Sequence, residues 1–228
     1  MRCSAALRAA RTHAASQNAS SGLWSVYYTH SKYTMMITHD EDYIRVIDGA
    51  LTPEECAMAC DLFEQDSSRH WVNGDRCIEL DLFGSAGNTK WRPSSQSKQA
   101  AWRPFADRVV STLTSAVTLY RDRWDPLHMM PQEWALEGLR VKCYRPMTHE
   151  FRLHVDQANR ASSPRFLACL LYLNSNEAGT EFPQFELTVG AKAGRMLLFP
   201  PTWQYPHRGH MPTTDTKYIA STYLHYKD

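Results

Sequence analysis

Three residues in the second half of the chain have side chains that can hold a metal ion. His154 and Asp156 flank Val155 in a segment that we expect to be extended, so both side chains point to the same side of the strand. His207 follows the apolar run 196–199 and is the candidate third ligand. Two imidazoles and one carboxylate on one face of an ion leave other positions open, an arrangement typical of iron(II) oxygenases.

Other histidines compete for the third position, because a bare HxD pair does not specify its partner. His149, His210 and His225 are all available, and His210 is the main rival because it lies three residues after His207. We predict that His154, Asp156 and His207 bind the metal, with His210 as the alternative third ligand.

Length and composition favour one folded domain. The chain has 228 residues, of which 43% are hydrophobic, enough for one well-buried core. Lys+Arg 25 against Asp+Glu 24 leaves a net charge of +1, which does not indicate a broad nucleic-acid-binding face. No apolar run approaches the roughly 20 residues that span a bilayer, and the scattered cysteines lack CxxC spacing. We expect a soluble intracellular protein with reduced thiols and no membrane partner, and the charge balance does not favour a nucleic-acid partner.

The N-terminal segment differs in composition from the rest. Residues 1–39 contain no Asp or Glu, while Arg2, Arg8 and Arg11 stand among alanines and serines. This composition is typical of an organellar transit segment, and it also suits a disordered tail. Both interpretations stay open, and we predict that residues 40–228 form a single domain.

Helical signals come first in that domain and strand signals follow. A short strand is expected at 43–47, and Thr52, Pro53 and Glu55 form the expected start of a helix. A second helix is predicted at 105–121, completing a helical support over 52–122, whereas 67–104 looks irregular apart from one strand near 78–82. Strands are predicted in a β core over about 135–226, near 138–144, 151–156, 165–173, 185–189, 195–199 and 217–225. This order favours a helical support packed on a β-sandwich or barrel.

The order of several short motifs resembles the prolyl-hydroxylase-like branch of the iron(II)/2-oxoglutarate oxygenases. The matching pieces are Ile44-Arg45-Val46-Ile47, Leu51-Thr52-Pro53-Glu54-Glu55-Cys56, Cys143-Tyr144, His154-Val155-Asp156, Leu171-Tyr172-Leu173-Asn174, Gly179-Thr180-Glu181-Phe182, Gly194 to Pro200, His207 and Lys217-Tyr218. Two departures concern the substrate class: Ala178-Gly179 stands where the family often has two glycines, and Tyr223 where it often has Trp.

The resemblance implies a double-stranded β-helix, or jelly-roll, with iron near its open end. It also implies that Lys217 pairs with the far carboxylate of 2-oxoglutarate, and that Tyr144 and Tyr172 donate hydrogen bonds to this cosubstrate. The residues agree for Lys217, because a lysine that points into a barrel needs an anionic partner. For the tyrosines, a purely structural hydrogen bond stays an alternative.

The implied activity is an Fe(2+)-dependent dioxygenase that consumes O2 and 2-oxoglutarate, releases succinate and CO2 and hydroxylates a C–H bond. The alternatives are a cupin-type dioxygenase without 2-oxoglutarate and a non-catalytic jelly-roll binding module.

Arg140, Lys142 and Tyr223 are the candidate substrate residues, since Arg140 and Lys142 share a strand face with Tyr144. If these cations face the pocket, the substrate is a small acidic metabolite or amino acid; a peptidyl proline stays an open alternative. An acid such as Glu137 that pairs with the cations is the competing interpretation.

Overall fold

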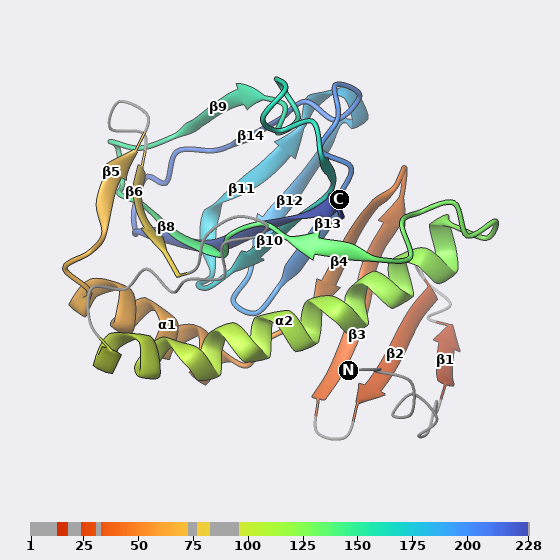
Figure 1. Ribbon diagram of the computed structural model, residues 1–228, viewed down its shortest axis with the longest axis horizontal. Helices are drawn as coiled ribbons and strands as arrows, with labels where there is room; N and C mark the ends of the chain where they lie inside the picture. The colour runs from red at the N-terminus through yellow and green to blue at the C-terminus, as the bar shows by residue number, and fades with distance from the viewer. Residues whose placement is uncertain (1–12, 18–23, 31–32, 73–76, 83–95, 228) are drawn as a thin grey trace.

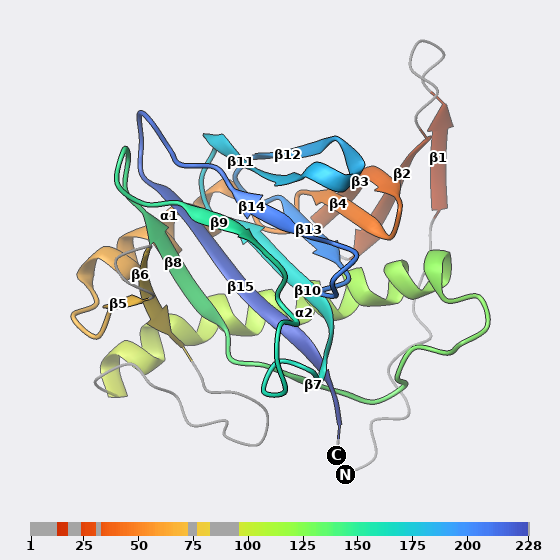
Figure 2. The ribbon, with the colours of Figure 1, turned by 90° about the horizontal axis from the view of Figure 1, so that it is seen from above.

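Two β-sheets form the framework of the molecule. The computed structural model describes residues 13–17, 24–30, 33–72, 77–82 and 96–227. The larger sheet contains β1 (His13–Gln17), β2 (Trp24–His30), β3 (Tyr33–Glu41), β4 (Ile44–Asp48), β13 (Met196–Phe199), β10 (Arg165–Tyr172), β15 (Lys217–Tyr226), β8 (Arg140–Tyr144), β6 (Cys77–Asp81) and β5 (His70–Val72) in that order, with β7 (Trp134–Leu136) paired to β15. The smaller sheet contains β12 (Leu187–Ala191), β11 (Asn176–Phe182), β14 (His207–Gly209) and β9 (Phe151–His154). The mainly β jelly-roll prediction is confirmed, and Figures 1 and 2 show the smaller sheet facing the larger one.

Two helices, α1 (Pro53–Gln65) and α2 (Gln96–Trp124), cover the outer face of the larger sheet (Figure 1). Helix α1 begins as predicted: the Thr52 hydroxyl accepts from the Glu55 N–H, and the Glu55 carboxylate accepts from the Thr52 N–H. Helix α2 begins nine residues before the predicted 105, because it continues through Pro104. Proline usually ends a helix, and here the packing of the helix on the sheet outweighs that preference.

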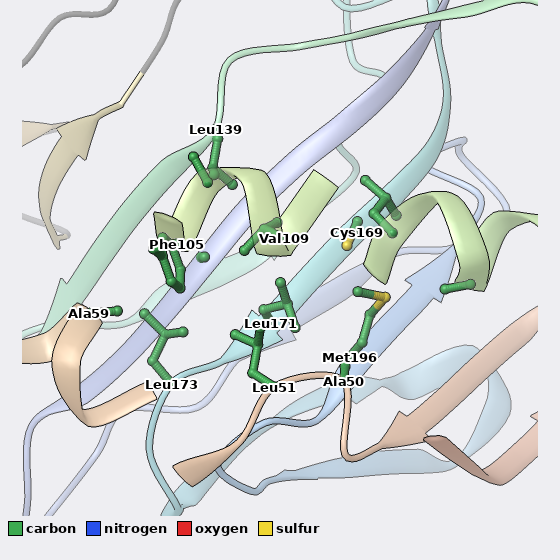
Figure 3. Close-up of a cluster of buried hydrophobic side chains, with 14 of the residues drawn as sticks. Ala50, Leu51, Ala59, Phe105, Val109, Leu139, Cys169, Leu171, Leu173 and Met196 are labelled. Carbon is green, nitrogen blue, oxygen red and sulfur yellow. The ribbon is translucent and has the colours of Figure 1, made fainter. Parts of the chain in front are cut away.

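The main hydrophobic core lies between these helices and the larger sheet (Figure 3). Phe105 and Val109 of α2 and Leu171 of β10 belong to this core, and all three side chains are buried. Gly194 lies under Leu51 with a φ of +76°, and a Cβ there would stand 2.1 Å from the Leu51 carbonyl oxygen. Only glycine fits this turn, which packs against the segment before α1 and leads into β13.

The N-terminal segment contains strands that its composition did not suggest. We expected residues 1–39 to be disordered or a transit segment, whereas β1, β2 and most of β3 lie within them. Strand β3 pairs with β4 in the register Ile37↔Ile47, and Met35 and Ile37 are buried. Their period of two is an ordinary strand signal, which the lack of acidic residues obscured. Residues 1–12 and 18–23 lie outside the described part, and targeting by this segment stays a prediction.

The β core contains three strands that were not predicted. These are β7, β11 and β14, and the strand expected at 185–189 begins at Leu187. Strand β14 has only three residues, too few to show a period. In the 67–104 region β5 and β6 form a hairpin, and residues 73–76 and 83–95 lie outside the described part. Within the described residues no helix is long and apolar enough to cross a membrane.

Candidate metal centre and cosubstrate pocket

His154, Asp156 and His207 come together at the end of the smaller sheet. Strands β9 and β14 are antiparallel neighbours, and their register places His207 directly opposite His154. The His154 Nε2 lies 3.3 Å from Asp156 Oδ1, and the His207 Nε2 lies 3.4 Å from Asp156 Oδ2. One ligand atom from each residue lies within 4.8 Å of the others. We refer to these three residues as the triad.

Backbone carbonyls set the orientation of both imidazoles. The Nδ1 of His154 lies 2.7 Å from the Arg152 carbonyl, and the Nδ1 of His207 lies 3.1 Å from the Tyr205 carbonyl. A carbonyl only accepts, so each Nδ1 carries a proton and a neutral ring presents the Nε2 lone pair to the triad. Burial lowers the pKa of His207, which favours that neutral form.

The triad lacks the partner that its polar atoms need. Burial raises the pKa of Asp156, but protonated neighbouring imidazoles and the Tyr223 hydroxyl outweigh burial and bring the value to about 2, so the carboxylate is ionised. A metal ion bound by the neutral rings would supply the same positive charge. Among the described residues, the buried His154 Nε2 and Asp156 Oδ2 atoms have no hydrogen-bond partner. Two nitrogen lone pairs facing a carboxylate repel unless a cation lies between them, and this donor set fits a divalent metal such as iron(II).

The remaining candidate histidines have other partners. The His210 Nε2 lies 2.6 Å from a Glu181 carboxylate oxygen, and the His225 Nε2 lies 2.7 Å from Glu137. The buried His149 accepts a backbone hydrogen bond at its Nδ1. In the part of the chain that the structure describes, the triad is the only group of at least three possible ligands. The geometry therefore favours His207 over His210 as the third ligand.

Lys217 points into the pocket that Asp156 and His207 line. Its side chain is 3% exposed, and its Nζ donates to the Gly179 carbonyl at 3.2 Å. A Cβ on Gly179 would stand 2.5 Å from the Val189 carbonyl oxygen, so the residue whose carbonyl accepts from the lysine must be glycine. No carboxylate among the described residues pairs with Lys217, and burial lowers its pKa to about 8. This environment suits an anionic ligand.

The two predicted tyrosines have different surroundings. Tyr144 lines the pocket and lies under the Lys217 ammonium, 5.8 Å from its ring centre. The Tyr172 hydroxyl instead donates to Thr180 Oγ1 at 2.8 Å, which is the structural alternative left open by the sequence. Thr180 itself lines the pocket and keeps its own proton, so it can donate to a ligand. Ser221, also buried in the pocket wall, has no hydrogen-bond partner among the described residues. The sequence did not single out these two hydroxyls.

The two predicted substrate cations are also unequal. The Arg140 guanidinium pairs with Glu137 at 2.9 Å, Asp81 at 3.3 Å and Glu79 at 3.4 Å. Arg140 is therefore neutralised by the protein, as in the competing interpretation, and it does not line the pocket. Lys142 does line the pocket, and its nearest carboxylate is Glu79 at 3.8 Å, beyond hydrogen-bonding distance.

Sequence comparison assigns this β core to a family. Residues 139–225 match the family model described as the 2OG-Fe(II) oxygenase superfamily, and this match contains every predicted site residue. Over these residues the chain is similar to 2OG-Fe(II) oxygenases. The predicted resemblance to the iron(II)/2-oxoglutarate oxygenases is confirmed, and iron and 2-oxoglutarate are the ligands that this family implies. No curated protein sequence matches the chain.

Several solved structures with the same fold are prolyl hydroxylases. A viral collagen prolyl hydroxylase from Paramecium Bursaria Chlorella virus-1, solved with 2OG, has a TM-score of 0.59 and 16% identity over 84% of this chain and 99% of that chain. A Trichoplax adhaerens prolyl hydroxylase, in complex with a hypoxia inducible factor peptide fragment, gives 0.57 and 14% over 81% and 84%. A Pseudomonas putida prolyl-4-hydroxylase gives 0.55 and 13% over 81% and 93%. At these identities the likeness establishes the fold.

Proposed function

We propose that this protein is an iron(II)- and 2-oxoglutarate-dependent dioxygenase that hydroxylates a C–H bond of its substrate. His154, Asp156 and His207 would hold iron(II), and Lys217 would bind the far carboxylate of 2-oxoglutarate. The observation that carries the proposal is a buried lysine, with no carboxylate partner among the described residues, in the same pocket as Asp156 and His207. A cupin-type dioxygenase that does not use 2-oxoglutarate has no need for such a lysine.

In this proposal the residues of the protein bind and orient the metal and the cosubstrate, and they exclude water from the pocket. When bound, iron(II) supplies the oxidising chemistry in which O2 and 2-oxoglutarate give succinate and CO2 while one oxygen atom enters the substrate C–H bond. Lys217 would compensate the charge of one cosubstrate carboxylate. The Thr180 hydroxyl lines the same pocket and would donate a hydrogen bond to that carboxylate. Phe199 and Phe182 pack on the His207 ring at centroid distances of 4.7 and 5.6 Å, which restricts water access behind the triad.

Of the two cations proposed to bind the substrate, Lys142 is the better candidate. Its Nζ lies 5.4 Å from the centre of the Phe151 ring, and the Phe151 ring lies 3.8 Å from the His154 ring. A carboxylate or phosphate of a small substrate would meet Lys142 beside the triad, which supports a small acidic metabolite or amino acid. The fold shared with prolyl hydroxylases supports the second candidate, a peptidyl proline.

Succinate formation tests the proposal. The purified chain is supplied with Fe(II), 2-oxoglutarate and O2, and succinate is measured against panels of amino acids, small acids, proline peptides and nucleotides. We expect Fe(II)-dependent succinate that rises with the correct substrate. O2 consumption that is independent of 2-oxoglutarate would instead indicate the cupin-type alternative. Metal binding without any O2 consumption would indicate a binding module.

A further inference from the structure

The carboxylate of Asp156 is held on one side only. The Tyr223 hydroxyl donates to Asp156 Oδ1 at 2.7 Å, and both side chains are buried. The other oxygen, Oδ2, has no hydrogen-bond partner among the described residues; it lies 3.4 Å from the His207 Nε2, while Oδ1 lies 3.3 Å from the His154 Nε2. The tyrosine therefore fixes which oxygen of the carboxylate is free.

Arg165 holds both Tyr223 and the backbone of Asp156. Its guanidinium carbon lies 3.9 Å from the centre of the Tyr223 ring, a stacked position. Its Nη1 donates to the Asp156 carbonyl at 2.7 Å. One side chain thus sets the spacing between the hydroxyl donor and the carboxylate that accepts from it.

Glu137 anchors Arg165 from behind. Its carboxylate accepts from Arg165 Nε at 2.6 Å and Nη2 at 2.7 Å, and it also pairs with Arg140 and His225. Glu137 is 3% exposed, and its backbone N–H donates to the Tyr223 carbonyl at 2.8 Å. A bidentate pair with this much support leaves Arg165 little freedom to turn.

We infer that Tyr223 and Arg165 are positioning residues that make Asp156 a ligand through Oδ2 alone. The inference rests on the proposed metal site and concerns its geometry. A carboxylate free to turn can bind a metal through both oxygens and occupy a coordination position that 2-oxoglutarate or O2 requires. By engaging Oδ1, Tyr223 would leave Oδ2 as the ligand atom of Asp156 and keep the remaining coordination positions available to 2-oxoglutarate and O2.

Cobalt(II) binding to the full chain tests this inference without turnover. In Tyr223→Phe we expect Co(II) to bind about 10- to 100-fold more weakly, the usual effect of losing a partner of a metal ligand. We also expect the visible absorption per bound Co(II) to fall, because cobalt absorbs less strongly as its coordination number rises. The metal-free melting temperature should fall by only about a few degrees, because the buried Asp156 Oδ1 loses one hydrogen bond while the ring stays packed.

Tyr218→Phe is the matched control. Tyr218 lies on the same strand, and its hydroxyl donates to Glu64 at 2.7 Å, away from the triad. This variant loses one tyrosine hydroxyl and its hydrogen bond, as Tyr223→Phe does, and should leave Co(II) affinity and spectrum unchanged. If Tyr223→Phe matched the wild type in both Co(II) affinity and spectrum, the inference about Tyr223 would be wrong.

Arg165→Lys tests the second positioning residue. Lysine keeps the charge beside Glu137 but loses the stacked plane and the paired donors, so we expect a smaller spectral change of the same sign. A lower melting temperature with an unchanged Co(II) spectrum would overturn the role of Arg165. The proposed function fails separately, if the wild type binds Co(II) at the triad yet forms no succinate from 2-oxoglutarate with iron.

Discussion

The cations near the two ends of strand β15 have different partners. At the Lys217 end, a buried ammonium meets one backbone carbonyl and no carboxylate among the described residues. Near the Tyr223 end, Arg165 forms two hydrogen bonds with Glu137, and Arg140 pairs with the same carboxylate. Both ends are cationic and largely buried, so the difference lies in what balances the charge.

This contrast separates a ligand site from its support. Burying a charge is costly unless an opposite charge or good hydrogen bonds compensate it. Glu137 compensates its arginines within the protein: burial raises its pKa, and the arginines outweigh that effect and bring it to about 2. Lys217 has no such partner, and the proposed 2-oxoglutarate would supply one. An unpaired buried cation thus indicates a ligand more specifically than a cation count does.

The largest expected loss of activity follows from replacing a residue of the triad. His207→Ala should abolish Fe(II)-dependent succinate formation, because two remaining ligands hold iron too weakly against water. His210→Ala should retain most activity, since its Nε2 pairs with Glu181. Succinate is measured for both variants at matched protein folding, checked by circular dichroism. Retained activity in His207→Ala together with a loss in His210→Ala would reverse the ligand assignment.

The next effect separates the two ends directly. Lys217→Met should raise the KM for 2-oxoglutarate by roughly 30-fold or more, since an interaction with a buried charge commonly contributes about 2–5 kcal/mol. Its Fe(II) affinity should change little, because the lysine does not belong to the triad. Steady-state kinetics in 2-oxoglutarate give the KM, and a metal titration provides the control. An unchanged KM would remove the main support for 2-oxoglutarate as cosubstrate.

Local patterns in the sequence predicted the elements that obey a single period or motif. The helix start at Thr52 and the strands that carry Tyr144, His154 and Lys217 follow from capping residues and alternation. The pairing of His207 with His154 depends on strand register between distant segments. The position of His207 after the apolar run 196–199 and the family resemblance suggested this pairing, but His210 stayed open as the alternative. Strand β14 is too short to show a pattern of its own.

Side-chain partners across strands were the least predictable feature. Alternation correctly placed Arg140 and Lys142 on one face, but it did not show that Glu79 and Asp81 of β6 lie opposite them. That pairing joins segments far apart in sequence, and it decides that Arg140 is paired while Lys142 faces the pocket. The hydroxyl of Thr180 was missed for the same reason, because its partner Tyr172 lies on the other sheet.

A smaller effect should distinguish the two substrate candidates on β8. Arg140→Met should lower the free energy of unfolding by about 1–3 kcal/mol, because it removes one partner of a partly buried ion network, and it should leave the substrate KM unchanged. Lys142→Met should raise the KM of an acidic substrate with little loss of stability. Chemical denaturation and substrate kinetics together separate these outcomes. A raised KM for Arg140→Met at unchanged stability would restore Arg140 as a substrate residue.

The smallest expected effect is a pH dependence that arises at the unpaired end of the pocket. Burial lowers the pKa of Lys217 to about 8 in the free protein, and a bound carboxylate would raise it again. Below pH 8 the ammonium is already present, so the KM for 2-oxoglutarate should be flat. Above pH 8 only the protonated fraction can bind the anion, and the KM should rise about 10-fold between pH 7 and pH 9.

The groups that face Lys217 do not obscure this titration. Burial raises the pKa of Tyr144 well above its usual value and that of Tyr172 to about 12, so neither tyrosine ionises below pH 9. The third polar neighbour is the Gly179 carbonyl, which does not titrate. Lys217→Arg provides the matched control, because a guanidinium stays charged throughout this range and should keep the KM flat from pH 7 to pH 9. If the wild-type KM were equally flat, or if the arginine variant showed the same rise, Lys217 would not be the group whose proton controls 2-oxoglutarate binding.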